Sequence, residues 1–233
     1  MLVPLSALGE EQAEGAVLES LLRRYTESYG GIRDENRLVT LRMEGVQIQG
    51  GAEYRIDLRR KRPEFYRYEL TRGESSLTAV FDGKSGWLRT EQATGVRVEK
   101  LSGSALAGLR AEARFDSALY RHRDKEENQI ALAGRQRIGS VEAYVLRVIE
   151  AERAAAVYYL HPENSRILRV DRLLEDGRAG MQTIYRDYRE VGGYAFAFEI
   201  ENRVDGETVS LTRLHQVLVN PGLLTVLFEA PTE

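Results

Sequence analysis

Apolar and polar residues alternate with a period of two along most of this chain, the pattern of β-strands that bury one face. The clearest example is the stretch 184–202, which Gly192 and Gly193 divide into two arms of a hairpin. On the second arm one face carries Tyr194, Phe196, Phe198 and Ile200, and the other carries Ala195, Ala197, Glu199 and Glu201. Such a hairpin lines an ordinary β core in most proteins, and the alternative is the wall of an open barrel that holds an apolar ligand.

Helical spacing replaces this alternation in two places. Residues 10–29 place an apolar stripe on one side of a helix that Gly30 and Gly31 end, and the stripe consists of Ala13, Val17, Leu21, Leu22 and Tyr25. Residues 104–114 form a second, short helix of small and charged residues. This helix either caps one end of the sheet or acts as a lid over a cavity, and the two alternatives stay open.

The remaining segments predict consecutive antiparallel strands joined by short turns. The strands are expected within 36–48, 54–58, 66–70, 77–81, 129–138, 141–149, 154–161, 166–174 and 208–219, besides the hairpin. A phase slip at Gly45 predicts a bulge, Asp82 and Gly83 predict a tight turn, and the apolar tail 220–228 is expected to pack back on the sheet. The fold class is therefore mainly β (α+β): a highly curved antiparallel sheet of about 10–12 strands, an incomplete barrel whose concave face the two helices cover.

Composition adds few constraints. The apolar residues are spread evenly over 233 residues, which predicts one domain over 1–233, with 1–9 a leader remnant or disordered. A net charge of -3 gives no reason to expect nucleic acid. The basic run Arg59–Arg62 is expected to be a solvated turn, with lipid headgroups or a phosphate as the alternative. The chain has no cysteine, so disulfides and a cysteine nucleophile are excluded.

Catalytic and metal-binding patterns are missing from the sequence. His122, His161 and His215 fall in unrelated segments, and neither a Gly-x-Ser-x-Gly elbow nor a phosphate loop is present. A pair of carboxylates across a cleft is left open, but nothing in the sequence selects one. The charged run 186–190 is expected to form cross-strand pairs on a solvated face. We expect no enzyme activity, no metal and no cofactor.

Several short motifs, in their order and spacing, resemble the LolA/LolB-like superfamily of bacterial lipoprotein carriers over nearly the whole chain. The motifs are the N-terminal helix before Gly30-Gly31, 63–69 followed by 81–87, 158–162 with 166–170, 188–194, and 220–223 with Phe228 and Pro231. The resemblance implies an incomplete antiparallel barrel with helices in its mouth, whose apolar inner surface shelters acyl chains. It also implies, as an alternative, a module for protein interaction or envelope-stress sensing without cargo.

The alternation and the resemblance together predict binding of a lipid, an acyl chain or a lipoprotein anchor by a non-enzymatic protein of the periplasm or envelope, whose export signal has been removed. We expect a monomer, with an envelope protein or the membrane surface as further partners. The residues expected to face the cavity are Met43, Tyr54, Ile56, Tyr66, Tyr68, Leu77, Phe81, Trp87, Tyr188, Phe196, Phe198 and Leu211.

Overall fold

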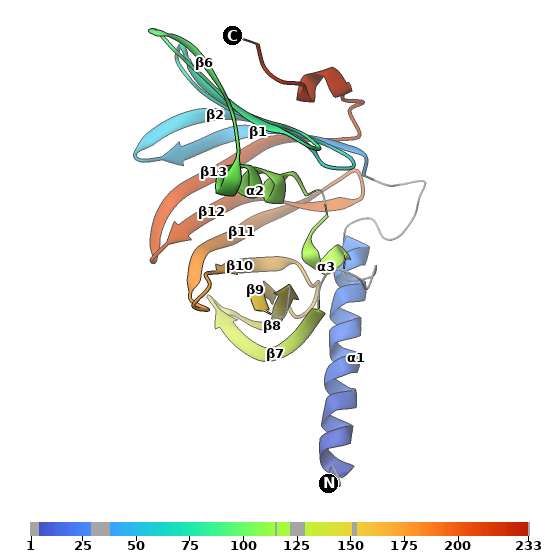
Figure 1. Ribbon diagram of the computed structural model, residues 1–233. Coiled ribbons are helices and arrows are strands. Elements are labelled where there is room, and N and C mark those ends of the chain that lie inside the picture. Colours follow the sequence, from blue (N-terminus) through green and yellow to red (C-terminus); the bar gives the residue numbers. More distant parts are fainter. Residues whose placement is uncertain (1–4, 29–37, 115, 122–128, 151–152, 233) are drawn as a thin grey trace. The chain divides into compact units, whose positions relative to one another are not determined.

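The computed structural model describes residues 5–28, 38–114, 116–121, 129–150 and 153–232. In this part of the chain, thirteen strands form one antiparallel sheet in the order β6-β5-β4-β3-β2-β1-β13-β12-β11-β10-β9-β8-β7 (Figure 1). Because β6 and β7 stand at the two ends of this order, the sheet does not close into a barrel. The predicted open antiparallel sheet is confirmed, with thirteen strands in place of ten to twelve.

The elements follow the predicted sequence of one helix, a set of strands, a short helix and a second set of strands, with one strand and one further short helix, 95–100 and 118–121, that were not predicted. Their bounds are α1 (Leu5–Ser28), β1 (Thr40–Gln49), β2 (Ala52–Lys61), β3 (Phe65–Arg72), β4 (Ser75–Asp82), β5 (Gly86–Gln92), β6 (Gly95–Lys100), α2 (Gly103–Ala113), α3 (Ala118–Arg121), β7 (Gln129–Ile138), β8 (Val141–Glu150), β9 (Arg153–Leu160), β10 (Ile167–Leu173), β11 (Ala179–Val191), β12 (Tyr194–Val204), β13 (Glu207–Val219) and η3 (Thr225–Phe228).

The chain divides into two compact units. Unit 1 comprises residues 1–35, 117–197 and 201–208, and unit 2 comprises residues 36–116, 198–200 and 209–233. Unit 1 therefore contains α1, α3, β7 to β11 and most of β12, whereas unit 2 contains β1 to β6, α2, most of β13 and η3. The expectation of a single domain over 1–233 stays a prediction.

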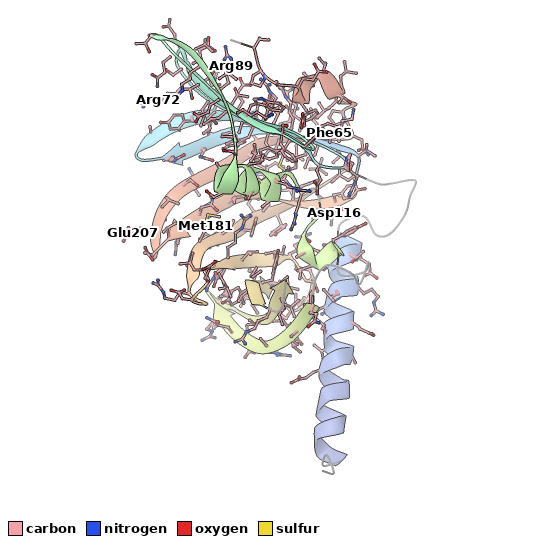
Figure 2. All side chains as sticks on the ribbon, in the orientation of Figure 1. Phe65, Arg72, Arg89, Asp116, Met181 and Glu207 are labelled. Atoms are coloured by element: carbon pink, nitrogen blue, oxygen red, sulfur yellow. The ribbon has the colours of Figure 1, made fainter. Side chains whose placement is uncertain are left out.

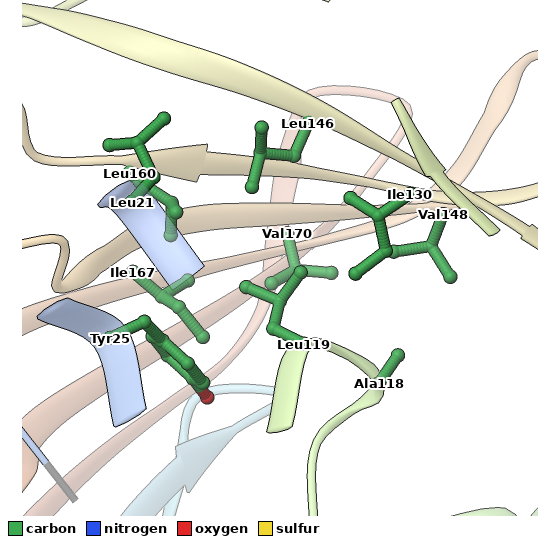
Figure 3. Packing of buried hydrophobic residues seen from close by; sticks show 10 residues of the cluster. All are labelled: Leu21, Tyr25, Ala118, Leu119, Ile130, Leu146, Val148, Leu160, Ile167 and Val170. Atoms are coloured by element: carbon green, nitrogen blue, oxygen red, sulfur yellow. The ribbon is translucent and has the colours of Figure 1, made fainter. Parts of the chain in front are cut away.

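The core of unit 1 forms where α1 and α3 pack against one face of the strands (Figure 3). Leu21 and Tyr25 of α1 are buried with Leu119 of α3, and the Tyr25 hydroxyl lies 2.8 Å from Ser117 Oγ. The strands contribute Ile130, Leu146, Val148, Leu160, Ile167 and Val170. The predicted helical stripe is thus confirmed from Val17 to Tyr25, whereas the side chain of Ala13 and residues Gly30 and Gly31 lie outside the described residues.

Helix α1 begins at Leu5, earlier than the predicted start near Glu10, so residues 5–9 are helical. The prediction missed this turn because residues 1–9 have no apolar stripe in phase with the rest of the helix. Whether 1–9 is a leader remnant stays a prediction.

The C-terminal segment of unit 2 packs back on the sheet, as predicted. Phe228 of η3 is fully buried, and its ring centroid lies 5.6 Å from that of Phe65 on β3, which Figure 2 labels. Lys61 Nζ donates hydrogen bonds to the Leu223 carbonyl oxygen at 3.0 Å and to Thr225 Oγ1 at 2.8 Å. The buried ring of Phe228 and the Lys61 side chain therefore contribute to holding the segment on the sheet.

The bulge predicted at Gly45 is confirmed, but the extra residue lies in the neighbouring strand. Glu44 pairs with Gln216 and Gly45 pairs with Leu214, so His215 is the residue left over in β13. Strand β1 keeps an unbroken register with β2, and Val46 therefore faces away from the side that Met43 occupies. Strand β1 is therefore regular, and the slip in its apolar pattern arises because its apolar residues lie on one face of the sheet before Gly45 and on the other face after it.

Replacing Gly45 by alanine is expected to lower the free energy of unfolding by about 1–3 kcal/mol. A Cβ atom at this position would lie 2.2 Å from the Arg213 carbonyl oxygen and 2.8 Å from Leu214 Cα, and backbone atoms cannot rotate away. Urea unfolding measures the change. The matched control is Gly108→Ala in α2, where a Cβ would meet nothing within 4 Å, and we expect it to stabilise by about 0.5–1 kcal/mol. Equal effects of the two substitutions would contradict the bulge geometry.

The hairpin of β11 and β12 has the predicted turn. Gly192 and Gly193 both adopt positive φ, 60° and 83°, which suits the two-residue turns that join twisted strands. Phe196 and Phe198 are buried, but Ala195 and Ala197 on the other side of β12 are buried too. Both sides of this part of the strand are therefore covered.

Glu201, on the small and charged side of the second hairpin arm, is only 6% exposed. Its carboxylate accepts hydrogen bonds from Arg203 Nε at 2.6 Å, Arg186 Nη2 at 2.8 Å and Thr208 Oγ1 at 2.6 Å. The Arg186 contact is the cross-strand charge pair expected for 186–190, with the carboxylate buried instead of solvated. These partners replace the lost water and allow burial.

Candidate ligand-binding face

One face of the sheet in unit 2 gathers apolar and tyrosine side chains from consecutive strands. Residues paired directly across neighbouring strands point to the same side of a sheet. Met43 pairs with Leu58, Leu58 with Tyr68, and Tyr68 with Ala79. Extending these pairs gives what we call the tyrosine face: Met43, Tyr54, Ile56, Leu58, Tyr66, Tyr68, Leu70, Leu77, Ala79, Phe81 and Leu88.

The tyrosine face includes all of the predicted cavity residues that lie in β1 to β4. They are Met43, Tyr54, Ile56, Tyr66, Tyr68, Leu77 and Phe81. Their shared face follows directly from the alternation, because β1 to β4 pair without a shift of register among themselves. Whether this face binds a ligand stays a prediction.

Trp87 and Leu211, also predicted to face the cavity, lie on the opposite side. Trp87 pairs with Val80, and its neighbour Gly86 pairs with Phe81 of the tyrosine face. Leu211 pairs with Ile48, whereas Thr212 pairs with Gln47 on the tyrosine face. In both strands the predicted inward-facing positions were shifted by one residue, and a shift of one residue moves a side chain to the opposite face of the sheet. The causes are the turn before β5 and the extra residue in β13.

The other predicted residues lie elsewhere in the chain. Tyr188 belongs to unit 1, where its hydroxyl donates a hydrogen bond of 2.8 Å to the Ile167 carbonyl oxygen and the Arg166 guanidinium lies 5.5 Å from its ring. Phe196 falls in the range of unit 1, and its ring centroid is 6.3 Å from that of Tyr194. Phe198 falls in the range of unit 2 and is buried. The strand pairs that define the tyrosine face, in β1 to β5, do not include these residues.

Helix α2 packs on one end of the tyrosine face. Leu106, Leu109 and Ala113 of the helix contact Tyr66 and Phe81. The helix also approaches the backbone of β5, since a Cβ on Gly86 would lie 2.9 Å from Leu109 Cδ2 and 3.0 Å from Leu106 Cδ1. Ala113 is the one residue of α2 that is buried, and Ser102 provides no side-chain cap. The contact of α2 with the sheet therefore depends on a few apolar side chains.

Along β4, exposure on the tyrosine face increases with distance from the end that α2 covers. Tyr66 is 6% exposed and Phe81 is 1% exposed, whereas Leu77, two pairs further along β4, is 36% exposed. Tyr54 and Leu70 beside it are half-buried. Within the described residues of unit 2, the apolar surface thus continues beyond the helix.

The polar groups of the tyrosine face are mostly uncharged. Tyr68 donates a hydrogen bond of 2.7 Å to Gln47 Oε1, which also accepts one of 3.1 Å from Thr212 Oγ1. Burial raises the pKa of the Tyr66 and Tyr68 phenols well above their usual range. Both rings therefore stay neutral at physiological pH.

Arg60 is a residue of this face that the sequence prediction missed. It pairs with Leu41 on one side and with Tyr66 on the other, although the run 59–62 was interpreted as a solvated turn. The signal was present in the alternation of β2, where Arg60 continues the series of Tyr54, Ile56 and Leu58.

The described residues offer no other obvious chemistry. They contain no group of three or more histidine, cysteine, aspartate or glutamate side chains that could hold a metal ion. None of the helices found in them combines the length and the apolar character that a membrane crossing requires. His122 lies outside them, and His161 and His215 are in separate units.

Comparison with known proteins identifies the fold. No family model matches the sequence, and no curated protein matches it either. Among solved structures, a DUF1329 family protein from Desulfovibrio piger is similar with a TM-score of 0.63 at 12% identity, covering 93% of this chain and 97% of that chain. An outer membrane lipoprotein-sorting protein domain from Vibrio parahaemolyticus gives 0.62 at 11% identity, covering 91% and 97%. A LolA superfamily protein from Nitrosomonas europaea gives 0.57 at 16% identity, covering 91% and 97%. Such low identities show the fold alone, and the chain therefore has the LolA-like fold that its motifs predicted.

Proposed function

We propose that this protein is a non-enzymatic carrier of the bacterial envelope that binds the acyl chains of a lipid or of a lipoprotein anchor on its tyrosine face. The observation that supports this most directly is the incomplete cover of an apolar face. Leu77, Tyr54 and Leu70 are left partly accessible, whereas α2 buries Tyr66 and Phe81 at the other end. Similar solved structures include a lipoprotein-sorting domain, which favours an acyl ligand and an envelope location.

Binding of this kind requires apolar area and no catalytic group. Removing a methylene from water contributes about 0.8 kcal/mol, so a long chain laid over partly accessible side chains such as Leu70 and Leu77 gains affinity with each carbon. The tyrosine hydroxyls do not oppose this, because Tyr68 already donates its hydrogen to Gln47. The face can therefore accept a hydrocarbon chain without leaving this hydroxyl unpaired.

Helix α2 serves as the movable cover of the site in this proposal. It is short, it contacts the face through Leu106, Leu109 and Ala113, and its first turn lacks a side-chain cap. When α2 moves away, Phe81 and Tyr66 become accessible. The acyl chain then contacts these two side chains in place of the apolar residues of the helix. The difference in free energy between the closed and ligand-bound states is then small, which suits a carrier that must release its cargo.

The proposal is tested by placing a charge on the tyrosine face. Leu77→Glu is expected to weaken binding of a neutral apolar probe, N-phenyl-1-naphthylamine, at least tenfold, because a bound chain would desolvate the new carboxylate. Probe fluorescence with delipidated protein measures the change. Native mass spectrometry of freshly purified protein is expected to show co-purified lipid in the parent and less in the variant.

The matched control is Val96→Glu, since Val96 is 37% exposed and pairs with Glu91 on the opposite face. We expect this substitution to leave probe affinity unchanged. Absence of saturable probe binding by the parent, or equal loss in both variants, would refute the proposed site. The cargo-free sensing module would then be the better description of the protein.

A further inference from the structure

The basic run 59–62 contains one guanidinium that differs from its neighbours. Arg59 Nη2 pairs with Asp57 at 2.6 Å, Lys61 binds the C-terminal segment, and Arg62 pairs with Asp116 and donates to the Leu38 carbonyl oxygen. Burial alone would raise the pKa of Asp57, and hydrogen bonds from Arg42 and Arg59 lower it instead. Arg60 forms no hydrogen bond or ion pair with any described residue, and its Nε is buried without a partner.

Arg60 lies on the tyrosine face, whereas Arg59 lies on the opposite one. Its cross-strand neighbours are Leu41, which is 4% exposed, and Tyr66, and its guanidinium carbon is 5.5 Å from the centroid of the Tyr66 ring. The ring offers a weak cation–π contact but no acceptor for the buried N–H group. Burying a charged donor without an acceptor costs more than a hydrogen bond is worth, so this arrangement favours an external acceptor.

An acyl chain beginning at Arg60 would continue along the strand over apolar side chains. Leu58, Ile56 and Tyr54 follow Arg60 on the same side of β2. From residue 60 to residue 54 the strand spans about 20 Å at 3.3 Å per residue, room enough for a long acyl chain. The charges of Arg60 and of Glu112, a residue of α2, both act on the Tyr66 phenol. If α2 moved off the tyrosine face, it would take the Glu112 carboxylate with it, and the anionic group of a ligand could bind near Tyr66 instead.

We propose that Arg60 binds the anionic head of an acyl ligand, a carboxylate or a phosphate, while the chain lies along β2 on the tyrosine face. The inference rests on the proposed function and narrows its ligand class to acyl compounds with an anionic head. A guanidinium suits both heads, because its parallel N–H groups can bind two oxygens at once.

Displacement of N-phenyl-1-naphthylamine by hexadecanoate, its methyl ester and hexadecyl phosphate tests the proposal. The parent protein is expected to bind hexadecanoate at least about tenfold more tightly than the ester, since a charge-assisted hydrogen bond is lost in the ester. In Arg60→Met the difference between acid and ester is expected to vanish while affinity for the ester stays the same. Arg60→Lys is expected to keep a reduced difference. The head group with the larger loss in Arg60→Met identifies the carboxylate or the phosphate as the preferred partner.

The matched control is Arg55→Met, because Arg55 is an exposed residue of the same strand that pairs with Val46 on the opposite face. It is expected to keep the preference for the acid. Arg60→Met should fold with an unchanged or higher Tm, because it removes a buried charge that has no partner.

A preference for the acid that persists in Arg60→Met would overturn this inference while leaving acyl binding intact. Equal binding of the acid and the ester by the parent protein would also overturn the role of Arg60 while leaving acyl binding intact. Failure of the parent to bind the probe or any of the three ligands would refute the inference and the proposed function together.

Discussion

Replacing Phe228 by alanine is expected to lower the free energy of unfolding by about 3–5 kcal/mol. The ring is fully buried, packs against Phe65 and is the main apolar contact between η3 and the sheet. Its removal leaves a cavity and frees the segment that Lys61 binds through two hydrogen bonds. Chemical unfolding of the full chain measures the loss, which is a large fraction of the stability of an ordinary domain.

Leu224, which directly precedes η3, provides the control. It is 68% exposed, so Leu224→Ala is expected to change the free energy of unfolding by no more than about 0.5 kcal/mol. If Phe228→Ala proved as mild as Leu224→Ala, η3 would not be packed against the sheet in solution.

Acid is expected to remove about 3 kcal/mol of stability through Glu201 alone. A hydrogen bond from Arg203, opposed by burial and reinforced by Thr208 and Arg186, lowers the pKa of this carboxyl from 4.5 to about 2. A carboxyl whose pKa is lower in the folded than in the unfolded chain stabilises the fold above its unfolded pKa. The contribution is therefore complete above pH 4.5 and disappears as the pH falls toward 2.

Glu201→Gln isolates this effect. The variant is expected to be less stable than the parent at pH 7, and its stability should fall less steeply between pH 4.5 and pH 2. Glu207→Gln is the matched control, because Glu207 is an exposed carboxylate of unit 1 at the start of β13, next to the turn that joins β12 and β13. Urea unfolding at a series of pH values makes the comparison. Parallel curves for Glu201→Gln and the parent would show that the carboxylate does not depend on these partners in solution.

The consecutive hairpins, the turns and the short helix could be predicted from the sequence because each has a local cause, whereas the pairing of β1 with β13 has none. Alternation identifies strands, and Asp82 or Gly192 identifies turns, without knowledge of the partner strand. The bulge could be located only in part, since the slip at Gly45 is visible in β1 whereas the extra residue, His215, lies far away in the chain. Nothing near His215 distinguishes an extra residue from a regular one.

The side on which a residue lies was predicted well where pairing is regular and badly next to irregularities. Tyr54, Tyr66 and Phe81 belong to an uninterrupted set of strands, so alternation was sufficient. Trp87 follows a turn, and the length of this turn decides which residues of β5 lie on the tyrosine face. The sequence prediction chose Trp87 because it is apolar, whereas the residue on this face is Gly86. The glycine faces α2 because the helix comes within contact distance of the sheet backbone, a tertiary requirement that composition does not reveal.

Charged residues were the least predictable from sequence. The alternation placed Glu201 on a small and charged side of its strand without indicating its burial, in which three donors from β11, β12 and β13 satisfy it. Arg60 was assigned to a solvated turn on the basis of its basic neighbours, whereas its strand position separates it from them. Local charge density describes a run as a whole, but in a strand successive residues meet different environments.

An open sheet has two terminal strands whose outer backbone groups could recruit another chain and start polymerisation. In β6 the charged residues Arg97, Glu99 and Lys100 make stacking of a second copy unfavourable. In β7 the pairing with β8 shifts between Leu132 and Arg135, and Gly134 adopts a φ of 103°, so the strand is irregular at its centre. Neither terminal strand is a good template for a further strand, so the sheet can stay open without recruiting a second chain.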